Sequence, residues 1–177
     1  MNKTTVYLGL GSNLGNKKNN ILNSLSIMEE KIDIVTVSSL YSTEPWGFKE
    51  QPIFLNAACE AKTTLGPLDL LAYLKSIEIL FGRTPSFSNG PRVLDIDILF
   101  YGNEVLNAPT LTIPHPRLSE RMFVLAPLAE IAPTLLHPTL EKTISELLLD
   151  TATENRVENI ELSPYPKKNT LGYEGNK

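Results

Sequence analysis

The hydrophobic positions of the chain predict two amphipathic helices in its first half. Apolar residues recur every three or four positions between residues 21 and 32, and again between residues 70 and 81. This spacing gathers apolar side chains on one face of a helix. Asn16 suits the cap of the first helix, and Gly66-Pro67 opens the second, because proline fits the first helical position. The predicted buried positions are Ile21, Leu25, Met28, Ile32, Leu70, Leu74, Ile77 and Phe81.

Four segments around these helices have strand patterns. A short strand at Val6–Leu8 leads into a glycine-rich turn at residues 9–13, and strands are predicted at Ile34–Tyr41 and Phe54–Ala61. The order of elements predicts an α+β fold with a ferredoxin-like βαββαβ core. Its sheet is mostly antiparallel, with helices packed on its faces in three α-β-α layers. The fourth strand, Val93–Tyr101, alternates most regularly, with Leu94, Ile96, Ile98 and Phe100 on one face and Asp95 and Asp97 on the other.

The pattern is less regular beyond residue 101. We expect a hairpin turn at Gly102-Asn103 between short strand pieces, and then two helices. Ser119 is the predicted cap of the first, which Pro127 interrupts or restarts, and Thr143-x-x-Glu146 is a capping box for the second. Polar and small residues dominate after that. We therefore expect one domain at residues 1–150 and a weakly ordered polar tail at residues 151–177.

Composition and charge narrow the class of protein. A chain of 177 residues with 42% hydrophobic residues suits one globular domain, and a net charge of -4 argues against a nucleic-acid partner. Cys59 is the single cysteine, so neither a disulfide framework nor a thiolate metal cage is possible. The N-terminus lacks the pattern of a signal peptide, and no run approaches the roughly 20 apolar residues of a membrane span. We expect a cytoplasmic monomer without a membrane partner.

The pair Asp95-Ile-Asp97 is the sharpest chemical feature. Strand geometry places both carboxylates on one face, with Cα atoms about 7 Å apart, where like charges repel. A divalent cation offsets that repulsion, and Mg²⁺ prefers oxygen ligands with phosphates completing its shell. An exposed strand face with two solvated aspartates is the alternative. Metal and polyphosphate binding is favoured by the cations on both sides of the strand, which are Arg83, Arg92, His115 and Arg121.

A second cluster combines aromatic rings with polar groups. Phe54, Phe123, Trp46 and Asn56 suit a flat heteroaromatic ligand, held between rings and bound at its edge by hydrogen bonds. Each ring could equally be a core residue. The glycine-rich turn matches neither the P-loop nor the dinucleotide fingerprint, because the lysine and glycine spacings differ. It could still let a ligand approach the backbone.

These blocks together resemble the 6-hydroxymethyl-7,8-dihydropterin pyrophosphokinase family, from about Val6 to about Pro133. The most specific run is Gly90-Pro-Arg-Val-Leu-Asp-Ile-Asp-Ile98 followed by Pro114-His-Pro-Arg117. Other blocks occur in the expected order. They are Gly9-Leu-Gly-Ser-Asn-Leu14, Tyr41-Ser-Thr-Glu-Pro-Trp-Gly47, Phe54-Leu-Asn-Ala57, Ile77-Glu78 with Gly82-Arg83, and Arg121 with Phe123.

The resemblance implies an enzyme of folate biosynthesis that transfers the diphosphate of ATP to the hydroxymethyl group of the dihydropterin and releases AMP. Two Mg²⁺ ions would be bound by Asp95 and Asp97, with Arg92, Arg83 and His115 completing the catalytic set. The pterin would be bound by Phe54, Phe123 and Asn56, with Thr43, Pro45 and Trp46 supplying backbone and wall contacts. The implied nucleotide contacts are Glu78, Arg83, Arg92, Ile98, Thr112, His115 and Arg121.

The chain departs from the family pattern at one loop. Members often carry basic residues and a tryptophan before Gly-Pro-Arg, in a loop that closes over the substrates. Here Thr84–Asn89 has no arginine, lysine or tryptophan, and Phe87 is the one ring. We expect a smaller contribution of this loop to closure. Two other hypotheses are a nucleotidyl transferase, which would release pyrophosphate in place of AMP, and a regulatory module that binds small molecules without catalysis.

Overall fold

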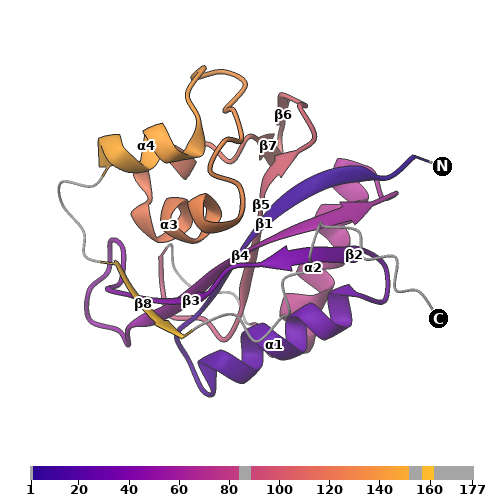
Figure 1. Cartoon of the computed structure of the whole chain (residues 1–177). Helices are drawn as coiled ribbons and strands as arrows, with labels where there is room; N and C mark the ends of the chain where they lie inside the picture. The colour runs from indigo at the N-terminus through magenta and orange to yellow at the C-terminus, as the bar shows by residue number, and fades with distance from the viewer. Residues whose placement is uncertain (1, 84–88, 152–156, 162–177) are drawn as a thin grey trace, which may run out of the picture.

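An antiparallel sheet forms the centre of the molecule (Figure 1). The computed structural model describes residues 2–83, 89–151 and 157–161. In the described residues this sheet has six strands in the order β5-β1-β4-β3-β8, and β2 also pairs with β4. The strands are β1 (Thr4–Ser12), β2 (Asp33–Val37), β3 (Leu40–Thr43), β4 (Phe54–Thr63), β5 (Asp95–Tyr101) and β8 (Val157–Glu161).

Helices cover both faces of the sheet. The first pair, α1 (Lys17–Met28) and α2 (Pro67–Leu80), packs on one face, and the second pair, α3 (Met122–Ile131) and α4 (Ile144–Thr151), lies over the other (Figure 1). Two apolar clusters fill the spaces between the layers. The β5-β1-β4-β3 order with these helices is the ferredoxin-like arrangement, so the predicted α+β fold with three α-β-α layers is confirmed.

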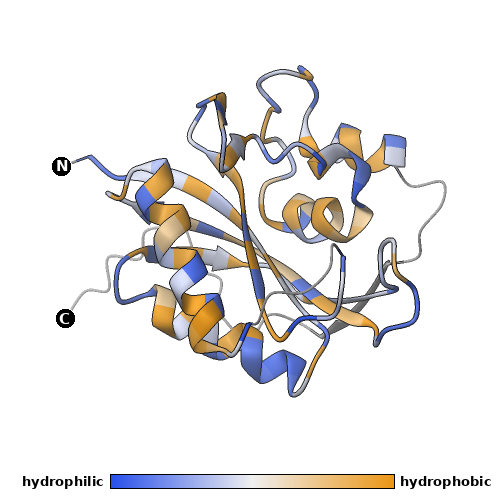
Figure 2. Ribbon diagram, turned by 180° about the vertical axis from the view of Figure 1, so that it is seen from behind, coloured by the Kyte–Doolittle hydropathy of each residue, from blue (hydrophilic) through white to orange (hydrophobic). Residues whose placement is uncertain are grey.

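Helices α1 and α2 begin where the sequence predicted, at the Asn16 cap and at Gly66-Pro67. The backbone N–H of Asn19 donates to Oδ1 of Asn16 at 3.1 Å, which caps α1. Hydrophilic residues colour the start of this helix in Figure 2. Pro67 occupies the first turn of α2 directly after Gly66. Of the eight predicted apolar positions, seven are buried in the cluster beneath the sheet, and Phe81 packs against it.

The predicted second strand is divided into β2 and β3 by Ser38 and Ser39. Oγ of Ser38 accepts the N–H of Ala58 at 2.9 Å, while the N–H and Oγ of Ser39 donate to the carboxylate of Glu130 at 2.9 and 3.0 Å. The backbone N–H of Ser38 still donates to the carbonyl of Ala58 at 2.8 Å, but side-chain oxygens take the place of ladder carbonyls for the N–H groups of Ala58 and Ser39. The prediction of one continuous strand was wrong for this reason.

The first and last core strands also differ from the predictions. Gly9 and Gly11 lie inside β1 and not in a turn. In β5, the register with β1 passes from Ile98 to Phe100 and skips Leu99. This extra residue is a bulge, which reverses the alternation beyond it. Phe100 consequently packs under α3 and α4, so its predicted face was wrong, whereas Leu94, Ile96 and Ile98 lie in the predicted core.

The later turns and caps are partly as predicted. The turn expected at Gly102-Asn103 is present, since the backbone N–H of Glu104 donates to the carbonyl of Tyr101 at 3.0 Å, but it only follows β5. The hairpin itself comes later and joins β6 (Leu106–Ala108) to β7 (Leu111–Ile113). Ser119 lies in a short 3₁₀ helix, η1 (Leu118–Glu120), and α3 begins after it and continues through Pro127. The capping box is confirmed, since the N–H of Thr143 donates to Glu146 at 2.7 Å and the N–H of Glu146 to Oγ1 of Thr143 at 3.3 Å.

The chain after α4 contributes one strand to the sheet. Val157–Glu161 pairs with β3 as the antiparallel strand β8, which the sequence analysis did not assign. Thr151, the first residue of the predicted tail, ends α4, whereas residues 152–156 and 162–177 lie outside the described ranges. The division at residue 150 stays a prediction. Among the described helices, none combines the length and apolar character needed to cross a membrane.

Candidate active site

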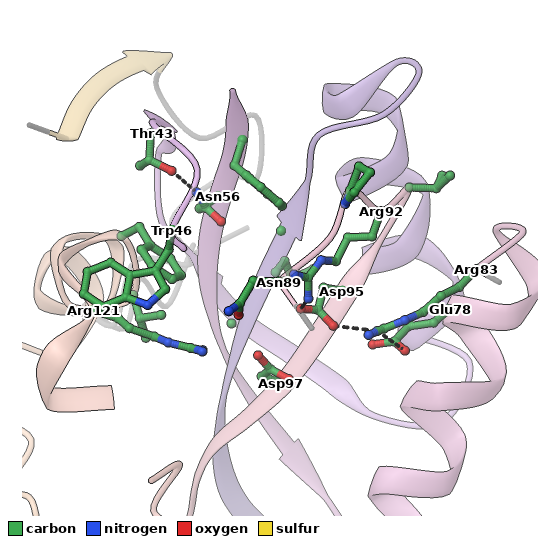
Figure 3. Close-up of a pocket in the computed structure, with 18 of the residues that line it drawn as sticks. Thr43, Trp46, Asn56, Glu78, Arg83, Asn89, Arg92, Asp95, Asp97 and Arg121 are labelled. Carbon is green, nitrogen blue, oxygen red and sulfur yellow. Dashed lines mark hydrogen bonds and ion pairs between the residues drawn. The ribbon is translucent and has the colours of Figure 1, made fainter. Parts of the chain in front are cut away.

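A cavity of about 760 Å³ opens over the β5-β1-β4 part of the sheet (Figure 3). Its floor follows from the strand register. Asp95 of β5 is paired with Gly11 of β1, which is paired in turn with Asn56 of β4. Because the central residue of this row has no side chain, the sheet face is open between the carboxylate and the amide. The two ends of the cavity therefore carry different chemistry over one continuous floor.

Asp95 is the centre of the charged end. Nη1 of Arg83 donates to its Oδ1 at 2.5 Å and Nη1 of Arg92 to its Oδ2 at 2.6 Å, with Nζ of Lys75 4.0 Å from Oδ1. Burial disfavours the charged carboxylate, but Arg92, Arg83 and Lys75 outweigh burial and hold the pKa of Asp95 below its ordinary value. Asp95 is therefore ionised and paired at neutral pH.

Glu78 supports this ion pair from α2. Its side chain is 1% exposed and also pairs with Arg83. Oε1 accepts the backbone N–H of Ile96 and Nζ of Lys75, each at 2.7 Å. A buried carboxylate with these partners anchors the helix to the strand next to Asp95 and orients the Arg83 guanidinium at the cavity wall.

Asp97 lies between Asp95 and Arg121 (Figure 3). Burial and the nearby charge of Asp95 raise the pKa of Asp97 to about 6. Among the described residues, this carboxylate forms no ion pair, in contrast to Asp95. The predicted repulsion within the pair is thus only partly offset by protein cations.

His115 and Arg121 face the same end of the cavity. Burial and the charges of Arg121 and Arg117 lower the pKa of His115 to about 4, so its imidazole is neutral at pH 7. Nδ1 of His115 accepts the backbone N–H of Arg117 at 3.3 Å, which places the ring proton on Nε2. Arg121 is 8% exposed, and its buried Nε has no hydrogen-bond partner among the described residues. Both side chains thus have a donor free for an anion.

The other end of the cavity is an aromatic slot with one amide. Phe54, Trp46 and Phe123 line it, and the rings of Trp46 and Phe123 lie 6.3 Å apart between centroids. Nδ2 of Asn56 donates to Oγ1 of Thr43 at 2.7 Å, so its Oδ1 faces the slot next to Gly11. This end can hold a flat ring and accept a hydrogen bond from its edge.

The cavity brings together most of the residues that the sequence indicated. Three of them do not line it. Pro45 is buried directly before Trp46, Ile98 lies in the core beneath the sheet, and Thr112 is half-buried in β7. Phe87 lies outside the described residues, so the expectation about its loop is not tested.

Several lining residues were missed by the sequence analysis. Lys75 lies one helical turn before Glu78, and Arg117 belongs to the Pro-His-Pro-Arg motif. Gly9 and Gly11 also line the cavity, as the sequence analysis allowed for the glycine-rich segment, but they lie in a strand and not in a turn. Glycine in a strand often marks close approach of a ligand or backbone, and the alternation of these glycines with leucines was the signal for a strand.

The donor set fits magnesium. Asp95 and Asp97 supply hard oxygen ligands from adjacent positions of one strand face. Burial and the charge of Asp95 raise the pKa of Asp97, and a bound cation would offset that charge. No group of three or more His, Cys, Asp or Glu side chains suited to a metal occurs in the described residues. Phosphate oxygens and water would have to complete the coordination shell, as Mg²⁺ usually requires.

Comparison with known proteins agrees with this geometry. The family model described as 7,8-dihydro-6-hydroxymethylpterin-pyrophosphokinase matches residues 7–133. The 2-amino-4-hydroxy-6-hydroxymethyldihydropteridine pyrophosphokinase of Aquifex aeolicus is 44% identical over 142 residues, which cover 80% of this chain and 89% of that protein. The folic acid synthesis protein FOL1 of Dictyostelium discoideum is 45% identical over 159 residues, 90% of this chain but 24% of that protein.

Solved structures show the same fold at low sequence identity. A crystal structure of HPPK-DHPS in complex with substrates superposes with a TM-score of 0.69 at 17% identity, covering 85% of this chain and 43% of that chain. Wild-type HPPK-DHPS of Plasmodium falciparum gives a TM-score of 0.67 at 18% identity, covering 84% and 44%. The chain spans less than half the length of these structures.

Proposed function

Because the chain belongs to the 7,8-dihydro-6-hydroxymethylpterin-pyrophosphokinase family, we propose that it transfers the terminal diphosphate of ATP to the hydroxymethyl group of 6-hydroxymethyl-7,8-dihydropterin and releases AMP. Membership of the family makes it an ATP-dependent diphosphotransferase of folate synthesis. The observation that best supports the reaction is the single cavity whose floor joins the Asp95 and Asp97 carboxylates to the aromatic slot around Asn56.

The pterin fits the aromatic slot. Its fused ring would lie between Phe54 and Phe123, with Trp46 at the wall and Oδ1 of Asn56 accepting a hydrogen bond from its edge. Thr43 holds the amide in that orientation through its hydroxyl. We also propose that Pro45 shapes the slot by fixing the backbone before Trp46.

ATP fits the charged end. Its phosphates would take donors from Arg83, Arg92, Arg121 and Nε2 of the neutral His115, with Glu78 orienting Arg83 from behind. Arg83 and Arg92 are paired with Asp95 in the free protein. When ATP and the metal bind, the two arginines would pair with phosphate oxygens and Asp95 with the metal. A single well-placed donor at the reacting phosphorus contributes about 3 kcal/mol to transition-state stabilisation. Ile98 and Thr112 stay proposed nucleotide contacts outside the described cavity lining.

We propose that Asp95 and Asp97 hold two Mg²⁺ ions, which would neutralise charge on the ATP phosphate oxygens. The hydroxymethyl oxygen of the pterin attacks the β-phosphorus of ATP, the bond between that phosphorus and the oxygen bridging to the α-phosphorus breaks, and AMP departs with that oxygen. The proton of the attacking hydroxyl passes to solvent water, since no described side chain of the cavity is placed as a dedicated general base. The residues of the cavity therefore act mainly by aligning the two substrates and neutralising charge.

Product identification tests the reaction. The protein is mixed with Mg-ATP and the dihydropterin, and nucleotides are separated by anion-exchange chromatography. Formation of AMP in step with loss of ATP is expected. Release of pyrophosphate would favour a nucleotidyl transferase, and no consumption of ATP would favour a binding module without catalysis.

Asp97→Ala tests the metal site. We expect turnover to fall by about three orders of magnitude or more, because the charge on the phosphates is no longer offset. Calorimetric binding of the dihydropterin should persist, since the aromatic slot is unchanged. Near-normal turnover of this variant would remove the metal from the mechanism.

The cell compartment and oligomeric state belong to the same proposal. A buried free thiol at Cys59 suits a reducing compartment, and we propose a cytoplasmic monomer with ATP and the dihydropterin as its ligands. Light scattering of the purified chain would test the monomer.

A further inference from the structure

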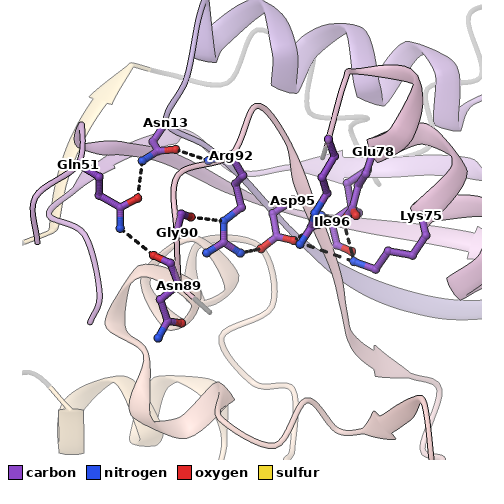
Figure 4. Close-up of polar contacts among 10 residues, drawn as sticks. Asn13, Gln51, Lys75, Glu78, Asn89, Gly90, Arg92, Asp95 and Ile96 are labelled. Atoms are coloured by element: carbon purple, nitrogen blue, oxygen red, sulfur yellow. Dashed lines mark hydrogen bonds and ion pairs between the residues drawn. The ribbon is translucent and has the colours of Figure 1, made fainter. Parts of the chain in front are cut away.

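Three loops at the edge of the cavity meet in one hydrogen-bonded cluster (Figure 4). The first loop follows β1 and contains Asn13. The second joins β3 to β4 and contains Gln51, and the third precedes β5 and contains Asn89 and Arg92. The second loop also carries Trp46 of the aromatic slot, whereas Arg92 belongs to the charged end.

Asn13 is the buried centre of the cluster, with 2% of its surface exposed. Asn13 forms two hydrogen bonds with the backbone of Arg92. The backbone N–H of Asn13 donates to the carbonyl of Arg92 at 3.1 Å, and Oδ1 of Asn13 accepts the backbone N–H of Arg92 at 2.7 Å. Its Nδ2 donates to Oε1 of Gln51 at 2.9 Å and to the carbonyl of Pro52 at 3.0 Å. The amide thus fixes the backbone of Arg92 against the second loop.

Gln51 extends this connection to the third loop. Its Nε2 donates to the carbonyl of Phe48 at 2.7 Å and to the carbonyl of Asn89 at 2.8 Å. Both donors and the acceptor of the Gln51 amide are therefore used, each on a different loop residue. Replacement by a side chain without an amide would break three connections at once.

A close contact brings the same two loops together at a second point. Gly47 has φ +82°, and a Cβ built there would lie 2.9 Å from Nδ2 and 3.4 Å from Cβ of Asn89. The second and third loops therefore touch both through Gln51 and through Gly47.

Arg92 spans the two ends of the cavity. Its Nη1 donates to Asp95 and its Nε to the carbonyl of Gly90 at 3.2 Å, while its Cζ lies 5.7 Å from the ring centroid of Phe54. A small displacement of its backbone would move the guanidinium relative to both the phosphates and the pterin ring. Misplacement of a catalytic group by about 1 Å can slow a reaction by about a hundredfold.

We propose that Asn13 and Gln51 are positioning residues that fix Arg92 for diphosphate transfer. Resting on the proposed function, this inference adds that Gln51 affects the rate through Arg92 and not through a contact with either substrate. The cluster keeps the guanidinium at a set place between the carboxylate pair and the aromatic slot.

A double-mutant cycle on Gln51 and Arg92 tests the proposal. Single-turnover rates of AMP formation are measured by quenched flow, or by hand for slow variants, in the wild type, Gln51→Ala, Arg92→Ala and the double variant. If Gln51 acts through Arg92, Gln51→Ala should lower the single-turnover rate about tenfold in the wild-type background. In the Arg92→Ala background the same change should lower the rate less than about twofold. An equal loss in both backgrounds would overturn the proposal, because it would mean that Gln51 acts independently.

Two further variants control for general disturbance of the loop. Lys49→Ala changes an exposed side chain of the same loop and should keep the wild-type rate. Gln51→Glu keeps an acceptor for Asn13 but loses the donors to Phe48 and Asn89, and it should be as slow as Gln51→Ala. A wild-type rate for Gln51→Glu would also overturn the proposal. Absence of AMP from the wild type would overturn the proposed function and this inference with it.

Discussion

At the scale of single residues, Asp95 and Asp97 have opposite electrostatic states although they lie two positions apart on one strand. Asp95 is surrounded by Arg92, Arg83 and Lys75, which keep it ionised. Burial and the charge of Asp95 disfavour the ionised form of Asp97 and raise its pKa. The strand pattern predicts that both face the same way, but only the tertiary position of the arginines decides which of the two is left with uncompensated charge.

This difference predicts a pH-dependent effect of Asp97→Asn on stability without metal or nucleotide. The pKa of Asp97 is raised to about 6, so the protonated side chain favours folding below about pH 4, and this contribution is lost as the pH rises through about 6. At about pH 8 the variant should be more stable than the wild type by roughly 1–3 kcal/mol, and the difference should vanish near pH 4. Urea denaturation in EDTA across this range provides the measurement.

Asp95→Asn is the matched control and should have the opposite sign. Its pKa is lowered, so its charged form stabilises the fold above its ordinary titration range and that contribution is lost as the pH falls through its folded value. Asp95→Asn should therefore destabilise the protein at neutral pH. Stabilisation by both variants would contradict the assignment of the arginines to Asp95.

Gly11 makes a second prediction at this scale. A Cβ at this position would lie 3.0 Å from Oδ1 of Asn56 and 4.0 Å from the ring of Phe54. Gly11→Ala should therefore weaken dihydropterin binding about tenfold, or about 1–2 kcal/mol, by displacing the acceptor. Binding of Mg²⁺ and a non-hydrolysable ATP analogue should change little, and calorimetry with each ligand alone would show this.

Gly9→Ala is the control for that variant. Its Cβ would meet Cδ2 of Leu99 at 3.4 Å, which is close to an ordinary contact and away from Asn56. An equal loss of dihydropterin affinity in both variants would show that the effect comes from the strand and not from the amide.

At the scale of elements, β5 shows how a local irregularity changes which side chains face the core. The regular alternation of residues 94–100 predicts the first part of the strand correctly, but the bulge at Leu99 turns Phe100 toward α3 and α4. The two helices offer an apolar surface there that the pattern within the strand cannot indicate. A similar cause divides β2 from β3, where Glu130 of α3 binds Ser39 and also accepts the hydroxyl of Tyr41 at 2.9 Å.

The capping box of α4 gives a prediction for this scale. Thr143→Ala removes the acceptor for the N–H of Glu146 and a hydroxyl that donates to its carboxylate at 2.7 Å. We expect a loss of about 1 kcal/mol in the free energy of unfolding, measured by urea denaturation. Thr134→Ala, at an exposed position between α3 and α4, is the control and should cost less than about 0.5 kcal/mol.

At the scale of the whole molecule, the last described segment completes the sheet beside the cavity. Strand β8 pairs with β3 along its length, from Leu40 opposite Glu161 to Thr43 opposite Val157. Thr43 also holds Asn56 in the aromatic slot. The backbone pairing of a segment far along the chain thus supports a residue of the proposed pterin site.

Ending the chain at Thr151 tests this support. Loss of β8 leaves one edge of β3 unpaired, so we expect a decrease of roughly 2 kcal/mol in the free energy of unfolding and weaker binding of the dihydropterin. Thermal denaturation and calorimetry measure the two effects. The matched control ends the chain at Glu161 and keeps β8, and equal losses in both truncated forms would contradict a role for this strand.

The sequence by itself determined α1, α2 and the succession of helices and strands in the core, and it indicated the residue types of the proposed site, because these depend on periodicity and on residues at fixed spacing. Asn16, the capping box at Thr143 and the Asp95-Asp97 pair are local features of this kind. The tertiary structure decided the bulge at Leu99, the strand register that places Gly11 between Asp95 and Asn56, and the cluster of Asn13 with Gln51. These features join residues from separate strands and loops, and their energies arise only once packing has brought those segments together.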